Sequence, residues 1–385
     1  MIIGVDARFA VRNRRGIGNY SLNLIRNLAI IDSVNQYILY IDMDDLEEVL
    51  PNQQNFFIKK LSPANYIVWE QVLLPLQAKR DNLDVLHCLG NTAPIKIARK
   101  TKLVLSIMDV MYLKDYSVLP QSYSTYQKFG RVYRKFIVPR AARNITKVIT
   151  ISNFSKTDIL YHIKTLHSDE VAVTYLAANG IFKHCKNELT FERLKKKYNI
   201  LDNFIFTLGA TDLRKNTERI VRVYLYLRSN KMLSEQLVIS GLPDWRDTPL
   251  YSMIQKSSLE KHIVFLDFVP EIELMCIYNF AKVFLYPSLY EGFGLPPLEA
   301  MSCGVPVITS NTTSIPEIVG NSAMLIDPYS DEAIKNALVL MLNDESLRNI
   351  YIERGYNQVK KFSWKKMASE TLGIYMELQS LEMIS

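Results

Sequence analysis

The sequence has few cysteines, and their spacing suits neither a metal site nor disulfide pairing. Cys88, Cys185, Cys276 and Cys303 are scattered over 385 residues, with no CxxC pair and no histidine at metal-ligand spacing. Structural zinc sites and disulfide-stabilised secreted domains are built from closely spaced cysteines. We therefore expect four reduced thiols in the core or in loops, and no bound metal.

Long hydrophobic runs and a leader peptide are lacking as well. No stretch approaches the ~18 uncharged apolar residues of a membrane-spanning helix. Residues Met1–Asp6 lack the basic and apolar regions of a signal peptide and are typical of a first β-strand. These absences favour a cytoplasmic protein. They also allow a cytoplasmic protein that contacts the inner face of a membrane peripherally.

The sequence also lacks a large charge of either sign. There are 46 Lys and Arg residues against 39 Asp and Glu, which gives a formal net charge of +7. This modest excess favours anionic partners, and nucleotides, phospholipids and nucleic acid all fit it. The hydrophobic share of 48% and the charged share of 22% are those of a globular protein with cores for two domains.

Short apolar runs alternate with helical patterns in both halves of the chain. The predicted strands are 2–7, 37–41, 84–87, 103–107 and 148–151, and then 204–208, 236–240, 263–265, 283–286, 305–309 and 324–326. Strands separated by helices predict parallel βαβ units, so the expected fold class is α/β with two doubly wound, Rossmann-like domains. The turn-forming Asn179-Gly180 and the polar stretch after it predict a boundary between residues 1–180 and 181–362.

A helix is predicted directly after the first strand. Its apolar residues recur at helical spacing, namely Ile17, Tyr20, Leu24, Leu28 and Ile31. Gly16 and Gly18 lie at its start, where free backbone N–H groups and the helix dipole favour an anion. A dinucleotide-binding fingerprint would need a third glycine at Ser21, so we expect donor binding at these glycines and no NAD site. A tight turn without a ligand is the alternative.

The segment from Tyr286 to Ile308 carries the most specific signal. It has the pattern of a strand, a glycine loop, a helix and the next strand. Gly292 and Gly294, with Phe293 between them, let the backbone approach a ligand closely, and the prolines after Leu295 suit the first turn of a helix. The loop therefore offers main-chain donors and a helix N-terminus to a phosphate.

Two glutamates flank this glycine loop. Glu299, which we expect in the first turn of the helix, could accept hydrogen bonds from ribose hydroxyls. Glu291 lies at the loop, and we expect it to be nearer than Glu299 to the departing group of a bound substrate. The alternative is a capped helix whose acids only complement its dipole.

These residues resemble the E-x7-E signature of the large retaining glycosyltransferase family 4, with Glu291 and Glu299 as its acids. Further similarities follow the family's order along the chain. Gly16-Ile17-Gly18 resembles the N-terminal glycine loop of bacterial polysaccharide mannosyl- and rhamnosyltransferases. Ser106–Asp109 resembles the family's T-x-H-D site, and Ile151–Ser155 resembles its S-x-x-S stretch. Leu208–Asn216 resembles its glycine-to-lysine phosphate loop, and Lys361–Trp364 resembles the entry to its C-terminal helix.

The resemblance implies a GT-B fold, in which two Rossmann-like domains face each other across a cleft. Residues 1–180 would bind the acceptor, 181–362 the nucleotide-sugar, and 363–385 would form a helix crossing back to the first domain. Asp109 and Glu291 would be catalytic, without metal or other cofactor. The implied donor-binding residues are Gly16, Gly18, Gly209, Arg214, Lys215, Gly292, Phe293, Gly294, Leu295 and Glu299.

The sequence departs from the family pattern at two positions. Met108 stands where the family usually has a histidine that touches the donor sugar, and Ala210 stands where many members have an arginine on the diphosphate. Lys215, helped by Arg214, is left as the phosphate ligand. Backbone amides with one cation still suffice for metal-free phosphate binding.

The expected activity is transfer of a hexose from a nucleotide-sugar to a glycan or lipid-diphosphate-linked glycan. GDP-mannose is the favoured donor by resemblance alone, while dTDP-rhamnose, UDP-glucose and UDP-N-acetylglucosamine stay open. Two alternatives belong to other classes: a GT-B-like sugar-nucleotide epimerase or phosphorylase, and a non-catalytic sugar-nucleotide-binding subunit.

The stretch Tyr116–Lys147 contains no acid and interleaves cations with aromatic residues. We interpret Lys128, Arg131, Arg134 and Lys135 as an acceptor or membrane contact, with nucleic acid not expected and a solvated helix face as the alternative. Asp42-Met43-Asp44 has the DxD form of a metal motif. It ends a predicted strand, where acids commonly begin a turn, so we expect no metal there.

Overall fold

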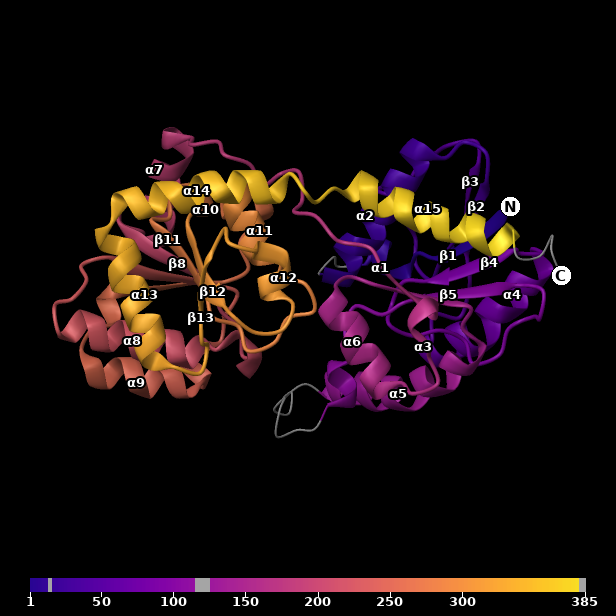
Figure 1. Cartoon of the computed structure of the whole chain (residues 1–385), viewed down its shortest axis with the longest axis horizontal. Helices are drawn as coiled ribbons and strands as arrows, with labels where there is room; N and C mark the ends of the chain where they lie inside the picture. The colour runs from indigo at the N-terminus through magenta and orange to yellow at the C-terminus, as the bar shows by residue number, and fades with distance from the viewer. Residues whose placement is uncertain (13–15, 115–124, 381–385) are drawn as a thin grey trace. The chain divides into compact units, whose positions relative to one another are not determined.

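The chain forms two compact units in the computed structural model, which describes residues 1–12, 16–114 and 125–380, without the side chains of 125–128. Unit 1 comprises Met1–Leu176 with Ser363–Ser385, and unit 2 comprises Ala177–Phe362. Figure 1 shows a parallel sheet with helices on both faces in each unit. The predicted fold class of two Rossmann-like α/β domains is therefore confirmed.

The sheet of unit 1 has the strand order β3-β2-β1-β4-β5-β6-β7, and every neighbouring pair is parallel. Its strands are β1 Ile2–Asp6, β2 Gln36–Ile41, β3 Phe56–Lys60, β4 Val85–Cys88, β5 Lys102–Ser106, β6 Lys147–Thr150 and β7 Val171–Val173. Its helices are α1 Arg8–Val11, α2 Gly16–Ile31, α3 Tyr66–Val68, α4 Leu74–Arg80, α5 Thr125–Ala141, α6 Asn153–His162 and α15 Trp364–Ser380. A π-helical turn, Trp69–Leu73, joins α3 to α4.

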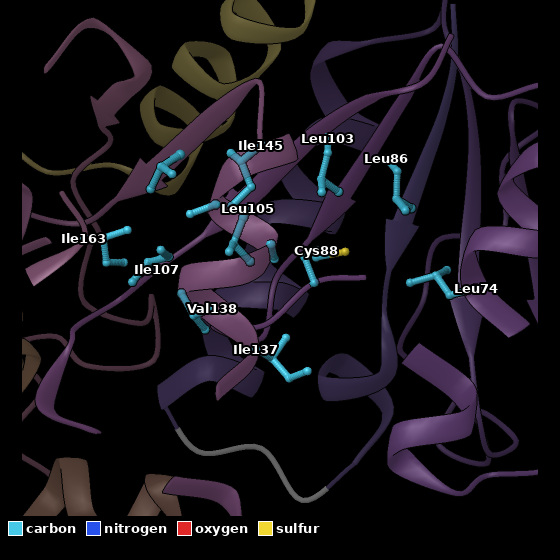
Figure 2. Packing of buried hydrophobic residues seen from close by; sticks show 14 of the residues in the cluster. Leu74, Leu86, Cys88, Leu103, Leu105, Ile107, Ile137, Val138, Ile145 and Ile163 are labelled. Carbon is cyan, nitrogen blue, oxygen red and sulfur yellow. The ribbon is translucent and has the colours of Figure 1, made fainter. Parts of the chain in front are cut away.

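Two helical layers cover the sheet of unit 1. The helices α2 and α15 pack together on one face. On the other face α4, α5 and α6 bury a continuous apolar core against β4 and β5 (Figure 2). Leu74 of α4, Val138 of α5, and Leu103 and Leu105 of β5 all belong to this core and are fully buried. Near-continuous apolar strands of this kind are expected in a parallel sheet that is covered on both faces.

The sheet of unit 2 has the order β10-β9-β8-β11-β12-β13, again parallel throughout. Its strands are β8 Phe204–Leu208, β9 Gln236–Ser240, β10 Ile263–Leu266, β11 Val283–Tyr286, β12 Val307–Ser310 and β13 Met324–Ile326. Its helices are α7 Glu188–Tyr198, α8 Thr217–Ser229, α9 Pro249–Ser257, α10 Glu271–Phe280, α11 Leu295–Ser302, α12 Ile315–Val319, α13 Asp331–Asn343 and α14 Glu345–Val359.

Aromatic residues fill one face of the unit 2 sheet. Phe191 of α7 stacks on Phe280 at the end of α10, with ring centroids 4.0 Å apart. Tyr278 of α10 packs edge-on against Phe206 and Phe284 of the sheet. The opposite face is covered by α8, α9 and α13 through aliphatic side chains. Of the helices that the structure describes, none is both long enough and apolar enough to cross a bilayer.

Candidate active site

The candidate site lies where the strand order of unit 2 reverses. β8 is the first strand of this unit, and it lies between β9 and β11, so the chain leaves β8 and β11 toward opposite sides. In open parallel sheets such a switch point leaves a crevice at the carboxyl ends of the two strands, where ligands bind. The loops that follow β8 and β11 contain Lys215 and Glu291.

The loop after β8 places Lys215 on a short 3-10 turn, Leu213–Lys215. Asp212 caps this turn, since its side chain accepts a hydrogen bond of 3.1 Å from the backbone N–H of Arg214. Asn216 has a positive φ of 58° and donates from Nδ2 to the carbonyl oxygen of Pro287 at 3.0 Å. The two switch-point loops are therefore tied to each other directly beside Lys215.

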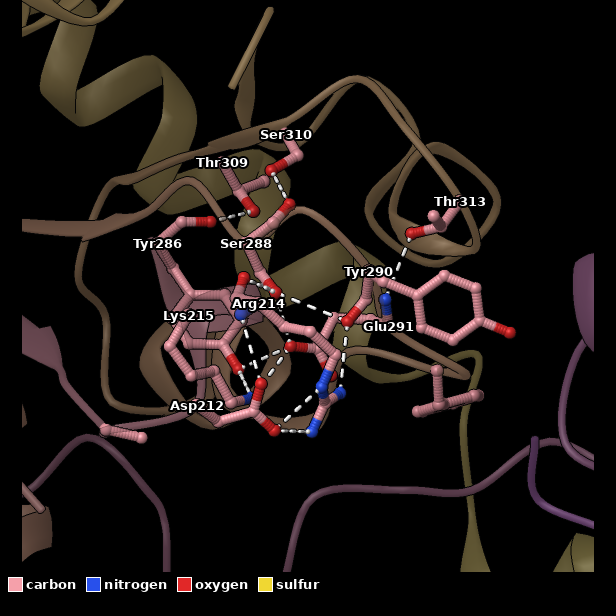
Figure 3. Close-up of polar contacts among 12 residues, drawn as sticks. Asp212, Arg214, Lys215, Tyr286, Ser288, Tyr290, Glu291, Thr309, Ser310 and Thr313 are labelled. Atoms are coloured by element: carbon pink, nitrogen blue, oxygen red, sulfur yellow. Dashed lines mark hydrogen bonds and ion pairs between the residues drawn. The ribbon is translucent and has the colours of Figure 1, made fainter. Parts of the chain in front are cut away.

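Glu291 is the centre of a buried polar cluster (Figure 3). Its Oε1 lies 2.7 Å from Lys215 Nζ and accepts hydrogen bonds from Tyr286 Oη at 2.8 Å and Ser288 Oγ at 2.7 Å. Lys215 Nζ also contacts Tyr286 Oη. Burial by itself would raise the pKa of Glu291, but the cations of Lys215 and Arg214 lower it to about 2. The structure therefore holds an ionised carboxylate against a lysine at the switch point.

Arg214 lies at the rim of this cluster. Its guanidinium pairs with Asp212 at 2.7 Å and donates to the carbonyl oxygen of Tyr290 at 3.3 Å. In the backbone, its carbonyl oxygen accepts hydrogen bonds from the N–H of Leu289 and from Ser288 Oγ. Arg214 and Lys215 thus bring two cations to the edge of the loop that follows β11.

The glycine loop has a conformation that side chains would disturb. Gly294 has a φ of +106°, and a Cβ atom there would lie 2.6 Å from Ile315 Cδ1. Ser314 Oγ donates to the carbonyl oxygens of Glu291 and Phe293, both at 2.9 Å, which fixes the loop from the start of α12. Phe293 is buried and packs edge-on against Phe362 at 5.8 Å. Gly294 therefore adopts a backbone conformation that suits glycine.

The helix after the loop differs from the prediction in one respect. α11 begins at Leu295, so Glu299 lies in its second turn and the prediction of a first-turn position is wrong. Pro296 and Pro297 occupy the first turn, and each lacks an N–H, so this helix end offers fewer backbone donors than most. Burial and the nearby Glu271 carboxylate raise the pKa of Glu299 to about 8.

Gly209 and Ala210 complete the loop after β8. A Cβ atom on Gly209 would lie 2.6 Å from Ile239 Cγ2, so this position is packed against β9. The backbone N–H of Ala210 donates to Thr217 Oγ1 at 3.2 Å. The two residues shape the turn that leads to Lys215.

Several predicted site residues belong to unit 1. Gly16 and Gly18 form the first turn of α2. Asp109 follows β5 and accepts a hydrogen bond of 3.1 Å from the backbone N–H of Met111. Met108 is buried, its N–H donating to Asn91 Oδ1 at 2.7 Å.

The predicted basic residues whose side chains are described differ in exposure. Lys135 is exposed on α5, whereas Arg134 is partly buried with its guanidinium 5.6 Å from the ring centroid of Tyr112. Arg131 donates to the carbonyl oxygen of Lys114. The side chain of Lys128 lies outside the described residues. The three described cations therefore have different surroundings.

The DxD-type acids are engaged in ion pairs with basic side chains. Asp42 pairs with Arg12, and Asp44 lies 2.7 Å from Lys60 Nζ. In the part of the chain that the structure describes, no group of three or more His, Cys, Asp or Glu side chains is placed to hold a metal ion.

Sequence reasoning missed a buried ionic cluster at the switch point of unit 1. Arg8 binds Asp6 with Nε and Nη2, at 2.9 and 2.7 Å, and its Nη2 reaches Glu70 at 3.0 Å. The guanidinium lies 3.8 Å from the ring centroid of Trp69, and all four residues are fully buried. The only signal in the sequence was that two charged residues, Asp6 and Arg8, lie at the end of an apolar strand. The cluster fixes the loop after β1 to the segment between α3 and α4.

Tyr286, Ser288 and Ser314 were also missed as site residues. Tyr286 and Ser288 belong to the predicted motif, but nothing local indicates that they bind Glu291. Ser314 lies 23 residues beyond Glu291 and reaches its carbonyl only because β11 and β12 are neighbours.

Comparisons with known proteins place this geometry in context. Residues 190–358 match the family described as Glycosyl transferases group 1. The chain is 29% identical over 376 residues to the O-antigen chain mannosyltransferase B of Escherichia coli, covering 94% of this chain and 95% of the relative.

Solved structures show the same fold at low identity. Sucrose-phosphate synthase from Thermosynechococcus elongatus superposes with a TM-score of 0.72 at 17% identity, covering 99% of this chain and 100% of that one. Anabaena HepE in complex with UDP gives a TM-score of 0.72 at 14% identity, covering 98% and 99%.

Proposed function

We propose that this chain transfers mannose from GDP-mannose to a glycan acceptor with retention of anomeric configuration. The chain is a glycosyltransferase of GT-B fold, and its residues 190–358 form a Glycosyl transferases group 1 domain. The likeness to an O-antigen chain mannosyltransferase over 94% of the chain supports both the sugar and a role in polysaccharide biosynthesis. The acceptor would be a glycan, free or linked to a lipid diphosphate.

The Lys215–Glu291 pair at the switch point of unit 2 is the observation that carries this proposal. A nucleoside diphosphate bound there would meet Lys215 and Arg214, which neutralise charge as it develops on the leaving phosphate. Glu291 holds Lys215 in place and offers its second oxygen toward the sugar hydroxyls. Glu299 would accept hydrogen bonds from the ribose.

In the proposed reaction the bond between the anomeric carbon and the diphosphate oxygen breaks, and the acceptor oxygen bonds to that carbon on the same face. The acceptor proton passes to the leaving phosphate oxygen, so no enzyme nucleophile is required. Unit 1 would bind the acceptor, with Asp109 orienting the acceptor or the sugar. Gly16 and Gly18 would add backbone donors for the donor substrate.

A panel of nucleotide-sugars tests the proposal. The purified chain is incubated with GDP-mannose, dTDP-rhamnose, UDP-glucose or UDP-N-acetylglucosamine, with and without a mannan-type oligosaccharide, and released nucleotide is measured. We expect acceptor-dependent release from GDP-mannose and an α-linked product by NMR. Lys215→Ala should abolish release, because it removes the cation on the diphosphate.

Each rival function gives a different result in this assay. A sugar-nucleotide epimerase would change the sugar without releasing nucleotide, and a phosphorylase would require inorganic phosphate. A binding subunit would hold nucleotide without turnover. Inversion to a β-linked product, or turnover with UDP-sugars alone, would contradict retention or the mannose donor respectively.

A further inference from the structure

Unit 1 exposes large apolar side chains beside cations on the surface formed by three segments: residues 66–80, residues 94–100 and α5. We name it the basic apolar surface. On α5, Tyr133 and Ile137 are buried in the core. Phe129, Val132 and Phe136 are 56%, 64% and 54% exposed at spacings of three and four residues, which places them on one outward stripe of the helix.

The three segments pack against one another. Tyr66 meets Tyr133 edge-on with ring centroids 5.5 Å apart, and Gln71 Nε2 lies 3.0 Å from Tyr133 Oη. Asn144 Nδ2, just beyond α5, donates to the carbonyl oxygen of Ile95 at 2.8 Å. The three segments are therefore neighbours in unit 1.

A surface hollow of about 330 Å³ lies between residues 66–80 and 94–100. Val72, Leu76 and Ile97 give it apolar walls, and Val72 and Leu76 are 47% and 50% exposed. Lys79 and Lys96 line the same hollow. Apolar walls with two lysines suit an amphiphile that carries an anionic group.

The charge of this surface is of one sign. Residues 71–80, 85–108 and 125–157 contain no Asp or Glu, and Glu70 is fully buried against Arg8. Lys79, Lys96 and Lys135 are exposed, and within the described residues none of the three forms an ion pair. Lysine is depleted in protein–protein interfaces, whereas interfacial membrane helices combine lysines with Phe and other large apolar residues.

We propose that the basic apolar surface docks unit 1 on an anionic lipid bilayer. Phe129, Val132 and Phe136 enter the boundary between headgroups and acyl chains, and Lys79, Lys96 and Lys135 lie at the lipid phosphates. This docking does not depend on which sugar the enzyme transfers, so its test needs no substrate.

Brominated lipids test insertion directly. Val132→Trp places a new fluorophore on the stripe, and Leu340→Trp, at a 50% exposed position of α13 in unit 2, is the matched control. With phosphatidylglycerol vesicles brominated in their acyl chains, we expect quenching of the added emission from Val132→Trp and none from Leu340→Trp. Unquenched Val132→Trp emission at saturating vesicles would overturn the proposal.

Vesicle sedimentation separates the apolar and the electrostatic contributions. Joint Phe129→Ser, Val132→Ser and Phe136→Ser substitutions should abolish binding to phosphatidylglycerol vesicles. Joint Lys79→Gln, Lys96→Gln and Lys135→Gln substitutions should weaken binding roughly 100-fold, at about fivefold for each cation. Pure phosphatidylcholine vesicles should bind the wild-type chain weakly.

Matched changes on unit 2 provide the controls. Leu189→Ser, Leu340→Ser and Ile350→Ser remove three exposed apolar residues, and Arg193→Gln, Lys196→Gln and Lys256→Gln remove three exposed cations. Both control sets should bind vesicles like the wild-type chain. Equal loss in control and test sets would overturn the assignment of this surface. The assignment would also be overturned if light scattering showed a wild-type dimer that the Phe129, Val132 and Phe136 substitutions dissociate. A second copy of the chain would then cover the basic apolar surface.

Discussion

Glu291 combines deep burial with a full negative charge, and the two are compatible only because its partners are fixed. Lys215, Tyr286 and Ser288 all direct donors at the same carboxylate oxygen. A buried carboxylate without such partners would take up a proton instead. The ionised state is therefore a property of the whole cluster.

Replacing Glu291 by Gln should lower both stability and activity. The pKa of Glu291 in the fold, about 2, lies below the ordinary value of 4.5, so its ionised form stabilises the fold above pH 4.5 and this contribution disappears toward pH 2. We expect the free energy of unfolding at pH 7 to fall by about 3 kcal/mol. Urea unfolding measured from pH 7 to pH 3 should show the gap between wild type and variant closing.

The same variant should lose at least ~100-fold in transfer rate, because an electrostatic contact at the site is removed. A stability gap that is constant with pH would contradict the charged role of Glu291. Ser302→Ala, on the neighbouring helix α11, is a suitable control because, within the described residues, Ser302 Oγ bonds only its own helix, at Leu298 O.

Glu299 has the opposite protonation behaviour. Its pKa of about 8 leaves it mostly neutral at pH 7. If it accepts hydrogen bonds from ribose hydroxyls, binding favours the carboxylate and a proton is released. Titration calorimetry of GDP in two buffers of different ionisation enthalpy should detect this proton.

Two variants of Glu299 isolate that effect. Glu299→Gln should release fewer protons than the wild type, and Glu299→Ala should weaken GDP binding by roughly 1.5–3 kcal/mol. Identical proton release in the wild type and in Glu299→Gln, with unchanged affinity in Glu299→Ala, would remove Glu299 from the ribose site.

At the level of elements, the C-terminal helix α15 is connected to the sheet of unit 1 through a buried polar chain. Tyr375 Oη lies 2.5 Å from His87 Nδ1, and His87 Nε2 lies 2.7 Å from Ser106 Oγ. Tyr20 of α2 completes the chain at 2.7 Å from Ser106 Oγ. Burial lowers the pKa of His87 to about 3, so the ring is neutral in the fold.

Tyr375→Phe should weaken the docking of α15, because it leaves a buried nitrogen of His87 without its partner. We expect the free energy of unfolding to fall by about 1–3 kcal/mol in chemical denaturation at pH 7. Tyr161→Phe, at a 68% exposed position of α6, is the matched control and should change stability by less than about 0.5 kcal/mol. Equal effects in both variants would mean that the His87 contact contributes nothing.

At the level of the whole molecule, we predict that transfer proceeds without a divalent metal. Lys215 and Arg214 bring two cations to the switch point, which can neutralise a diphosphate. Activity with GDP-mannose should therefore persist in EDTA at the untreated rate. Full loss in EDTA that Mn²⁺ restores would point to a metal-bound diphosphate, and Asp42→Asn would then show whether the Asp42-Met43-Asp44 acids hold the metal.

The parallel α/β architecture was predictable because each inner strand is a short apolar run. Phe204–Leu208, Gln236–Ser240 and Val283–Tyr286 were predicted with their observed bounds. The strands β3 and β7 were missed. β3 is an edge strand with three of its five residues exposed, and β7 is an edge strand of three residues, so the apolar run in each is only three residues long.

The sequence by itself determined the series of strands and helices and the glycine loop, because apolar periodicity and backbone freedom act over a few residues. The tertiary structure decided which polar groups meet. Glu291 and Lys215 are 76 residues apart, Glu70 and Arg8 are 62 apart, and Tyr375 and His87 are 288 apart. The packing of strands, helices and loops brings each pair together. It also decides the charge state of each buried group, because a pKa depends on neighbours that no local pattern contains.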